Sequence, residues 1–506
     1  MSALRIYVMK KIIGLLFIAM VPAVAGAQGV LSIDSCRAMA MRNNKQLQIG
    51  RLKQDMAGSL RKVAKSKFLP RVNAYGAYSW MSKEVSILND DQKSALNNLG
   101  TNVVSGLSSS SALTSANGVV EQMAEQGLLS LEQAQTLSQH LMSATASQLN
   151  SAGSSIVDAT RTDTRNIFAG SISVMQPIFF GGRITAMNKM AEYSEQLAYT
   201  NYDQSSQNVI YDVDNAYWLV VSLKHKQKLA EKYLQLVQKL DDDVQKMINQ
   251  GVATRADGLK VDVKVNEAEM QKTQADNGVS LAKMYLSQLC GLPVSDDITL
   301  ADENDETIDQ AVASSDFDMQ KAEDQRPELQ MLSTMIGMSE QVTKMMRADY
   351  MPMVALTGGY LITNPNMFNG FEKKFSGVWN VGVLMRVPIW NWFETANKIR
   401  ASKAATSIAR LEYEEAREKI QLQLNQSSFK VKEANKKYAM ALKNTEKAEE
   451  NLRCANLGFR EGVIESTTVM EAQTAWLQAQ TQKIDAAIDV KITQLALRKA
   501  MGEIYY

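Results

Sequence analysis

The sequence predicts an α+β membrane protein in which two pairs of short strands alternate with two pairs of very long helices. Three observations support this prediction. The chain repeats its own landmarks, four short segments alternate apolar and polar residues, and two long stretches contain neither Pro nor Gly. With 506 residues but 8 Pro and 27 Gly, the chain has few points at which an element can be interrupted, so long elements are expected.

Residues 1–27 have the pattern of a secretory signal peptide, with a basic patch, an apolar run and the small-residue motif Ala25-Gly26-Ala27. No later stretch reaches the roughly 18 continuous apolar residues of a membrane-spanning helix. The mature protein is therefore expected to be periplasmic, secreted or a membrane β-barrel, whose strands escape hydropathy analysis.

Internal repetition sets the order of the elements. A shift of 211 positions aligns three landmarks without a gap: Pro177 with Pro388, Gly251 with Gly462, and Gly291 with Gly502. Further upstream the shift becomes 282, which aligns Pro70 with Pro352 and Gly76 with Gly358. The first half of the chain therefore carries extra residues between its two strands.

We expect a first repeat at residues 28–292, an acidic connector with a short helix at 293–325, and a second repeat at 326–506. The first repeat comprises a helix, a strand at 70–80, an extra loop at about 82–160, a strand at 166–176, and helices at 183–250 and 253–290. The second comprises a helix, strands at 352–362 and 376–387, and helices at 394–460 and 466–501. Within the extra loop, residues 119–146 have helical composition, and the rest is expected to be flexible.

The strands are predicted from alternation with a period of two. In the last of them one face carries apolar residues throughout: Trp379, Val381, Val383, Met385 and Val387. Each strand runs for about ten residues, the length of a tilted strand that crosses a bilayer. Four such strands are too few to close a barrel.

The long helices are predicted from the absence of breakers and from heptad spacing. Residues 183–250 contain no Pro or Gly, and at about 1.5 Å per residue they span roughly 100 Å. Coiled-coil a and d positions are occupied by Ala230, Tyr233, Val237, Leu240, Val244 and Met247. On the last helix small residues recur every seven positions: Ala472, Ala479, Ala486, Thr493 and Ala500.

Charge and reactive residues exclude several classes of protein. The formal net charge of +1 argues against nucleic-acid binding. Cys36, Cys290 and Cys454 are odd in number and far apart, which argues against a disulfide framework, and Cys36 is expected to be a buried thiol. The sequence has two histidines and no G-x-S-x-G elbow, so we expect no catalytic residues, no metal site, no cofactor and no enzyme.

Several segments together resemble the TolC-type outer-membrane efflux proteins, the outer-membrane factors of tripartite efflux pumps or type I secretion systems. These segments are the signal peptide, "LSIDSCRAMAMRNNKQLQIG", "FLPRVNAYGAY", "VMQPIFFGGR" and the helix turn "INQGVATRADGLK". The resemblance covers nearly the whole mature chain apart from the extra loop at about 82–160.

The resemblance implies a homotrimer in the outer membrane of a Gram-negative bacterium. Three protomers, with four strands each, would close a 12-stranded β-barrel that continues into a periplasmic α-helical coiled-coil barrel. An open sheet edge is not stable in lipid, and four strands cannot close a barrel, so the strand count also indicates that several copies assemble. The implied function is a passive exit duct gated at its periplasmic tip, whose partners are outer-membrane lipid, a periplasmic adaptor (membrane fusion) protein and an inner-membrane pump of the RND or ABC type. The alternative is a soluble periplasmic coiled-coil adaptor or scaffold, which leaves the four strands unexplained.

Two sets of site residues lie at the strand-to-helix junctions. Pro177 and Pro388 are expected to mark the points where strand becomes helix, because proline suits the first helical turn. Aromatic residues there are expected to form an interfacial girdle, with an ordinary aromatic core cluster as the alternative: Phe179, Phe180, Trp390, Trp392 and Phe393. The first junction contains Gly181-Gly182 where the second contains Trp392-Phe393, so the two need not bend alike.

Gly251 and Gly462 are expected to turn the chain at the tips of the helical hairpins. The resemblance implies acidic rings just inside the tip, which aligns Glu471 with one ring position and Thr468 with the other, and Asp257 with the equivalent position on the first hairpin. Asp257 also fits a capping box with Thr254, and Glu471 fits a solvated helix charge. The exported substrate is not predicted.

Overall fold

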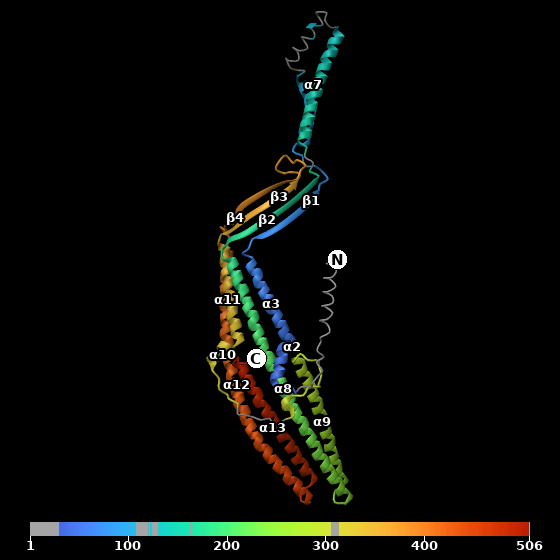
Figure 1. Ribbon diagram of the computed structural model, residues 1–506, viewed down its shortest axis with the longest axis vertical. Helices are drawn as coiled ribbons and strands as arrows, with labels where there is room; N and C mark the ends of the chain where they lie inside the picture. The colour runs from blue at the N-terminus through green and yellow to red at the C-terminus, as the bar shows by residue number, and fades with distance from the viewer. Residues whose placement is uncertain are drawn as a thin grey trace, which may run out of the picture. The chain divides into compact units, whose positions relative to one another are not determined.

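The structure is a computed structural model that describes residues 30–84, 86–107, 120, 122–123, 130–161, 164–304 and 313–504. The expected signal peptide lies outside the described residues. The chain divides into a helical unit and a second unit that contains the sheet and the extension between its first two strands. Figure 1 shows both units along the chain.

Two long helical hairpins dominate the helical unit. The first consists of α8 (Arg183–Asn249) and α9 (Arg255–Leu289), and the second of α12 (Glu394–Arg460) and α13 (Ser466–Ala500). The outgoing helices have 67 residues each and the returning helices 35 each. The four helix starts and ends of the second hairpin follow those of the first by 211 positions, and α13 packs along α8 (Figure 1).

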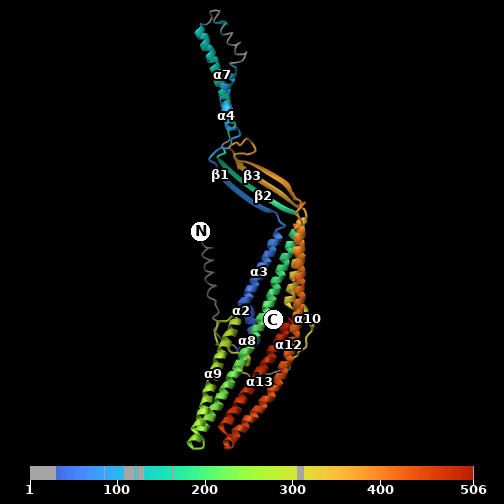
Figure 2. The same ribbon diagram turned by 180° about the vertical axis from the view of Figure 1, so that it is seen from behind.

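Shorter helices complete this unit. They are α2 (Ile33–Asn43), α3 (Lys45–Ser66), α10 (Met319–Gln325), α11 (Pro327–Arg347), and the 3-10 helices η1 (Ala301–Asn304) and η2 (Ala348–Tyr350). Both α3 and α11 pack in the helical unit beside the long hairpins, as Figures 1 and 2 show. Within the described ranges, no helix combines the length and the apolar composition that a bilayer span requires.

The coiled-coil positions predicted on α8 are buried. Tyr233, Val237, Leu240 and Val244 are each at most 4% exposed, and Met247 packs against them. Their cluster also contains Phe459, Val469 and Ala472 from the second hairpin, so one core joins the two hairpins. On α13 the small residues Ala472, Ala479, Ala486 and Ala500 are buried as well, which lets the neighbouring helices approach closely.

A second core holds the N-terminal segment and the connector against α8. The side chain of Arg37 on α2 donates two hydrogen bonds, of 2.7 and 2.6 Å, to the carboxylate of Asp214 on α8. The hydroxyl of Tyr217 donates to Asp302 at 2.5 Å, and Lys283 forms an ion pair of 3.2 Å with the buried Glu303. The start of the acidic connector is therefore fixed to the first hairpin by buried polar contacts.

The sheet contains β1 (Arg71–Trp80), β2 (Asn166–Phe180), β3 (Met353–Asn364) and β4 (Ser376–Arg386), antiparallel and in chain order (Figure 1). Its register brings the apolar phase of each strand to one face, because Val72 pairs with Val174, Val174 with Gly358, and Gly358 with Val381. The opposite face carries mainly small and polar residues: Asn73, Ser79, Ser171, Ser173, Thr357, Thr363, Ser376 and Asn380.

The prediction that β2 ends before Pro177 is wrong. β2 continues to Phe180, and its pairing with β3 contains a bulge between Pro177 and Phe179. The ladder with β1 ends at Met175, so at Pro177 one edge of β2 has no partner within the sheet. A proline lacks an amide donor and is tolerated at such an edge or bulge, which explains why it does not end the strand.

The prediction that most of the insertion at 82–160 is flexible is also wrong for its described residues. They form α4 (Asp90–Asn97), α5 (Leu99–Leu107) and α7 (Leu131–Ala159). Asn89 and Gln92 form a capping box that starts α4. Gly100 and Gly153 allow close helix contact, since a Cβ on either would overlap the backbone of a neighbouring helix. At its base, Glu84 forms ion pairs with Arg161 and Arg165.

Candidate functional site at the ends of the helical hairpins

Both hairpins turn through the same backbone motif. Gly251 and Gly462 have φ of +78° and +73°. In each turn the glycine amide donates to the carbonyl three residues back, and the next amide donates five residues back, which is a Schellman motif. No atom lies within 4 Å of a Cβ built on either glycine. The left-handed φ, not crowding, therefore explains why glycine occupies both positions.

Asp257 belongs to the capping box at the start of α9. Its carboxylate accepts hydrogen bonds from the Thr254 hydroxyl at 2.6 Å and the Thr254 amide at 3.2 Å, and it forms an ion pair of 3.2 Å with Lys260. These hydrogen bonds, with that of the Thr254 side chain contributing most, lower the pKa of Asp257. The carboxylate is thus already engaged in local contacts within its own hairpin.

The equivalent turn of the second hairpin has the opposite character. Glu465 precedes α13 without a side-chain cap, and Thr468 and Glu471 are exposed on its first turns. Thr468 and Glu471 occupy the positions of the second hairpin that align with Asp257 and Lys260, so the ion pair of the first hairpin has no counterpart there. Among the described residues, no hydrogen bond or ion pair engages the Glu471 carboxylate. This turn of the second hairpin therefore presents an uncompensated negative charge to solvent.

One residue that the sequence analysis missed connects the two hairpins. Gln473 on α13 is 2% exposed, and its amide nitrogen donates to the carbonyl oxygen of Leu236 on α8 at 3.3 Å. Its side-chain oxygen is buried without a hydrogen bond. Lys226 and Asp485 form a second link, an ion pair of 2.6 Å. The sequence signal for this contact was a glutamine that directly follows Ala472, a residue of the small-residue heptad on the last helix.

The two strand-to-helix junctions share a left-handed backbone, although their residues differ and need not have bent alike. Gly181 and Gly182 have φ of +61° and +82°, and Trp392 and Phe393, 211 positions later, have φ of +50° and +62°. The helices begin at the next residue in each case. Pro388 lies between the end of β4 and α12 and outside any helix, so neither proline occupies a first helical turn.

The expected aromatic residues are exposed to different degrees. Trp392 is 82% exposed, and Trp390 and Phe393 about two thirds. The ring of Trp390 contacts the rings of Trp392 and Phe393 edge to face, with centroids 5.8 and 5.5 Å apart. Phe179 is half-exposed on β2. These side chains do not form a buried core cluster in the isolated chain.

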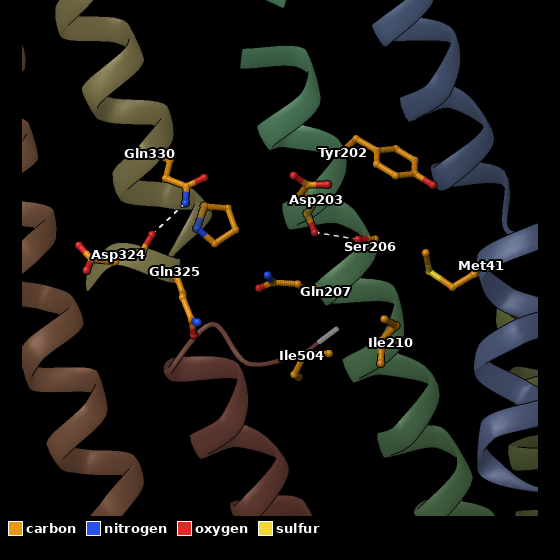
Figure 3. A pocket seen from close by; sticks show the side chains of 11 residues that line it. Met41, Tyr202, Asp203, Ser206, Gln207, Ile210, Asp324, Gln325, Gln330 and Ile504 are labelled. Atoms are coloured by element: carbon orange, nitrogen blue, oxygen red, sulfur yellow. Dashed lines mark hydrogen bonds between the residues drawn. The ribbon is translucent and has the colours of Figure 1, made fainter. Parts of the chain in front are cut away.

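A cavity of about 440 Å³ lies among α8, the α10–α11 segment and the C-terminal Ile504. In Figure 3 Gln207 extends from α8 towards the side that carries Gln325. The lining mixes polar and apolar side chains, and burial raises the pKa of Asp203. Among the described residues, no cluster of His, Cys, Asp and Glu has the arrangement of a metal site.

Comparison with known families identifies the chain. Its sequence matches the family described as outer membrane efflux protein over residues 142–292 and 319–503, more than half of its length. The chain belongs to the outer membrane efflux protein family. The predicted resemblance to TolC-type proteins is thereby confirmed.

A relative with a known role is similar to part of the chain. The alkaline protease secretion protein AprF of Pseudomonas aeruginosa is 22% identical over 284 residues, which is 54% of this chain and 58% of AprF. The chain thus matches less than two thirds of that relative.

Solved structures of outer membrane proteins and channels share the fold. VceC of Vibrio cholerae has a TM-score of 0.68 and 12% sequence identity, and the match covers 93% of this chain and 96% of VceC. The CmeC channel of Campylobacter jejuni has a TM-score of 0.68 and 12% sequence identity, and the match covers 93% of this chain and 85% of CmeC. The open MtrE channel of Neisseria gonorrhoeae has a TM-score of 0.65 and 15% sequence identity, and the match covers 93% of this chain and 88% of MtrE. These similarities establish the fold of an outer membrane efflux protein for this chain.

Proposed function

We propose that this chain is one of three identical subunits of a passive exit duct in the outer membrane of a Gram-negative bacterium. The observation that carries the proposal is the two-faced sheet. One face is apolar across all four strands and exposed, with Val72, Ile172, Tyr360 and Val381 between 46 and 68% exposed. A folded protein leaves such a face uncovered where it meets another apolar phase, and a bilayer supplies one.

The sheet also supports assembly into a ring. β1 and β4 are the edge strands, and each pairs with one strand within the sheet. An edge left open in lipid would expose unpaired amides and carbonyls at a cost of several kcal/mol each. Three copies of four strands close a twelve-stranded barrel, with the small and polar face lining the lumen.

The helical unit has its own surface for contacts between subunits. An apolar stripe with coiled-coil spacing runs along α3 and is more than half exposed at each position: Ile49, Leu52, Met56, Leu60 and Val63. Such a stripe is typical of a helix that packs against another helix. In the trimer it lies against a neighbouring subunit, and the two hairpins of each subunit, one from each repeat, build a tunnel across the periplasm.

We assign the aromatic residues near the junctions to the lipid–water interface: Phe179, Phe180, Trp390, Trp392 and Phe393. Aromatic side chains favour this layer, and exposed rings agree with it. Pro177 and Pro388 then precede the passage from membrane to periplasm.

The far ends of the hairpins, at Gly251 and Gly462, form the gate. Three copies of Glu471 around the axis would favour cations, as carboxylate rings do in other pores. Thr468 leaves the second ring position neutral. Asp257 serves mainly as a helix cap. Opening moves the second hairpin against the first, which breaks the contacts of Gln473 and Asp485.

The duct requires partners that supply energy and cargo. We propose a periplasmic adaptor protein that docks at the hairpin ends, and an inner-membrane pump of the RND or ABC type. The relative AprF is a secretion protein, whereas CmeC and MtrE are outer membrane channels, so the proposal covers both efflux and type I secretion. The alternative of a soluble adaptor does not account for the open apolar face.

Two matched substitutions on β4 test the proposal. Val381→Arg puts a charge on the apolar face at mid-strand, where a lipid-facing arginine costs about 2–4 kcal/mol. Asn380→Arg puts the same charge on the opposite face. We expect Val381→Arg to abolish trimers in the outer-membrane fraction, and Asn380→Arg to insert and shift the reversal potential of single channels towards anions. Equal membrane assembly of both variants would contradict the proposal.

A further inference from the structure

Two cysteines that lie 254 positions apart meet in the core of the helical unit. Cys36 on α2 is 0% exposed, and Cys290, the C-cap of α9, is 1% exposed. The Cys290 thiol lies 3.6 Å from the carbonyl oxygen of Cys36, and both side chains belong to the same buried cluster. Sequence separation argued against this pairing, but the fold brings the two side chains into contact.

The backbone on both sides of this contact is fixed independently of the sulfurs. The side chain of Asn44 donates to the carbonyl oxygen of Leu289 at 3.0 Å. Gly291 packs so closely on Asn43 that a Cβ would overlap it. The start of α2 is held by the paired hydrogen bonds of Arg37 to α8. The two cysteines are therefore held against each other by four neighbouring contacts.

We propose that Cys36 and Cys290 form a disulfide in the exported protein and that Cys454 remains a thiol. A disulfide requires a close approach of the two Cβ atoms, and the contacts around this pair hold the two buried cysteines beside each other. Exported proteins mature in an oxidising compartment, where such pairs form and persist. Cys454 is exposed on α12, and its thiol contacts Glu450 and Arg453, not another cysteine.

The oxidant is the disulfide of an oxidised thiol–disulfide oxidoreductase. One cysteine thiolate attacks that disulfide and forms a mixed disulfide, and the first oxidoreductase thiolate leaves. The second cysteine then attacks the mixed disulfide, which forms the Cys36–Cys290 bond and releases the second oxidoreductase thiolate. Two electrons and two protons pass to the oxidoreductase, which ends as a dithiol.

The reaction belongs to the folding stage. Both thiols are buried in the folded protein, so an oxidoreductase cannot reach them there. Oxidation before the core closes avoids this barrier. The resulting cross-link ties the N-terminal helix to the end of the first hairpin and encloses β1, β2, α8 and α9 in one covalent loop.

This inference rests on the proposed function in one respect, the export of the chain. Cells that express the full chain are quenched with acid, and the protein is denatured and labelled with a maleimide polymer that adds a fixed mass per thiol. We expect one label before reduction and three after it. The Cys454→Ser variant should show none before and two after. Three labels before reduction on wild-type protein from the outer-membrane fraction overturn the disulfide and leave the duct proposal standing.

Single variants identify the partners. Cys290→Ser and Cys36→Ser should each show two labels with or without reduction, because the remaining partner becomes free. The count is made on denatured protein, so it does not depend on whether a variant folds well. If Cys454→Ser frees a thiol that wild type lacks, the pairing involves Cys454 and our assignment is wrong.

Discussion

The side-chain amide of Gln473 on α13 donates a hydrogen bond of 3.3 Å to the carbonyl oxygen of Leu236 on α8, across the boundary between the two helical hairpins. Gln473 is almost fully buried beside an apolar cluster, and its side-chain oxygen Oε1 has no hydrogen bond. An unsatisfied buried acceptor costs about 1–3 kcal/mol. The contact between the hairpins is thus weaker than its buried area suggests, as the proposed movement of one hairpin against the other requires.

Gln473→Leu should hold the hairpins together more tightly. The substitution removes the unsatisfied oxygen and adds apolar contact, and the Leu236 carbonyl lies within α8, where it keeps a helical partner. We expect the separation of the hairpins to become harder by about 1 kcal/mol and the open probability of single channels in planar bilayers to fall about fivefold.

Gln480→Leu is the matched control. Gln480 lies two turns further along α13, and its amide binds Glu449 of the same hairpin at 2.6 Å. The Gln480→Leu substitution should leave the open probability of single channels unchanged. Equal effects of the two substitutions would show that the link to Leu236 does not control opening.

Glu471→Gln should reduce the preference of the channel for cations. The substitution removes three uncompensated charges from a trimer, whereas Thr468→Asp adds three at the adjacent position. The reversal potential under a salt gradient should move in opposite directions for the two variants. Both shifts should shrink in about 1 M salt, where the Debye length is about 3 Å. Shifts of the same sign would exclude a ring at this position.

Asp257→Asn should remove a pH-dependent contribution to the stability of the first hairpin tip. The pKa of Asp257 is lowered in the folded protein, so its carboxylate stabilises the turn above the ordinary value of about 3.9 and loses this effect as pH falls through the lowered pKa. Hydrogen exchange of the amides of residues 252–258 should be less protected at pH 3 than at pH 7 in wild type, after correction for intrinsic rates.

In Asp257→Asn the same amides should show nearly the same corrected protection at both pH values. The second tip is an internal control, because Thr468 occupies the aligned position and does not titrate. A wild-type tip with pH-independent protection would rule out the capping role.

The left-handed backbone at Phe393 should favour glycine over alanine. Phe393→Gly and Phe393→Ala both remove the ring contact with Trp390, so they differ in backbone strain alone. We expect the glycine variant to be more stable by about 1 kcal/mol. Gly182→Ala should cost a similar amount, since no atom lies within 4 Å of the added Cβ. Thermal unfolding followed by helical circular dichroism measures all three. An alanine variant as stable as the glycine variant would mean that Phe393 is not strained.

The long helices were predictable because their signals are local and redundant. Heptad residues such as Val237 and Val244 each report the same buried face, and the glycine turns recur in the second hairpin. Cys36 was expected to be a buried thiol, and it is 0% exposed. Burial of a whole face is decided by many residues together, so a single error does not change it.

The errors have a different origin, in the effect of neighbouring strands and helices on a local rule. Pro177 looks like a helix start until the free edge of β2 is known. Whether Trp392 and Phe393 would share the left-handed conformation of Gly181 and Gly182 was left open by the sequence, because their residue types do not indicate it. The insertion helices α4 and α5 are short and rely on contacts such as that of Gly153, which the sequence does not reveal.

The site was predicted in part. The turn glycines and the capping role of Asp257 follow from local patterns, but Gln473 and the Cys36–Cys290 contact depend on which helices lie side by side. The roles of Glu471 and Thr468 stay predictions until conductance is measured.

The insertion between β1 and β2 leaves and re-enters the sheet at neighbouring points. The amide of Met81 donates to the carbonyl oxygen of Arg165 at 2.8 Å, and Trp80 pairs with Asn166 in the adjoining ladder. The excursion is therefore a cassette: a chain that joins Met81 to Arg165 through a tight turn keeps every ladder bond of the sheet. Whatever this cassette contributes can be removed or exchanged without changing the pairing of the sheet.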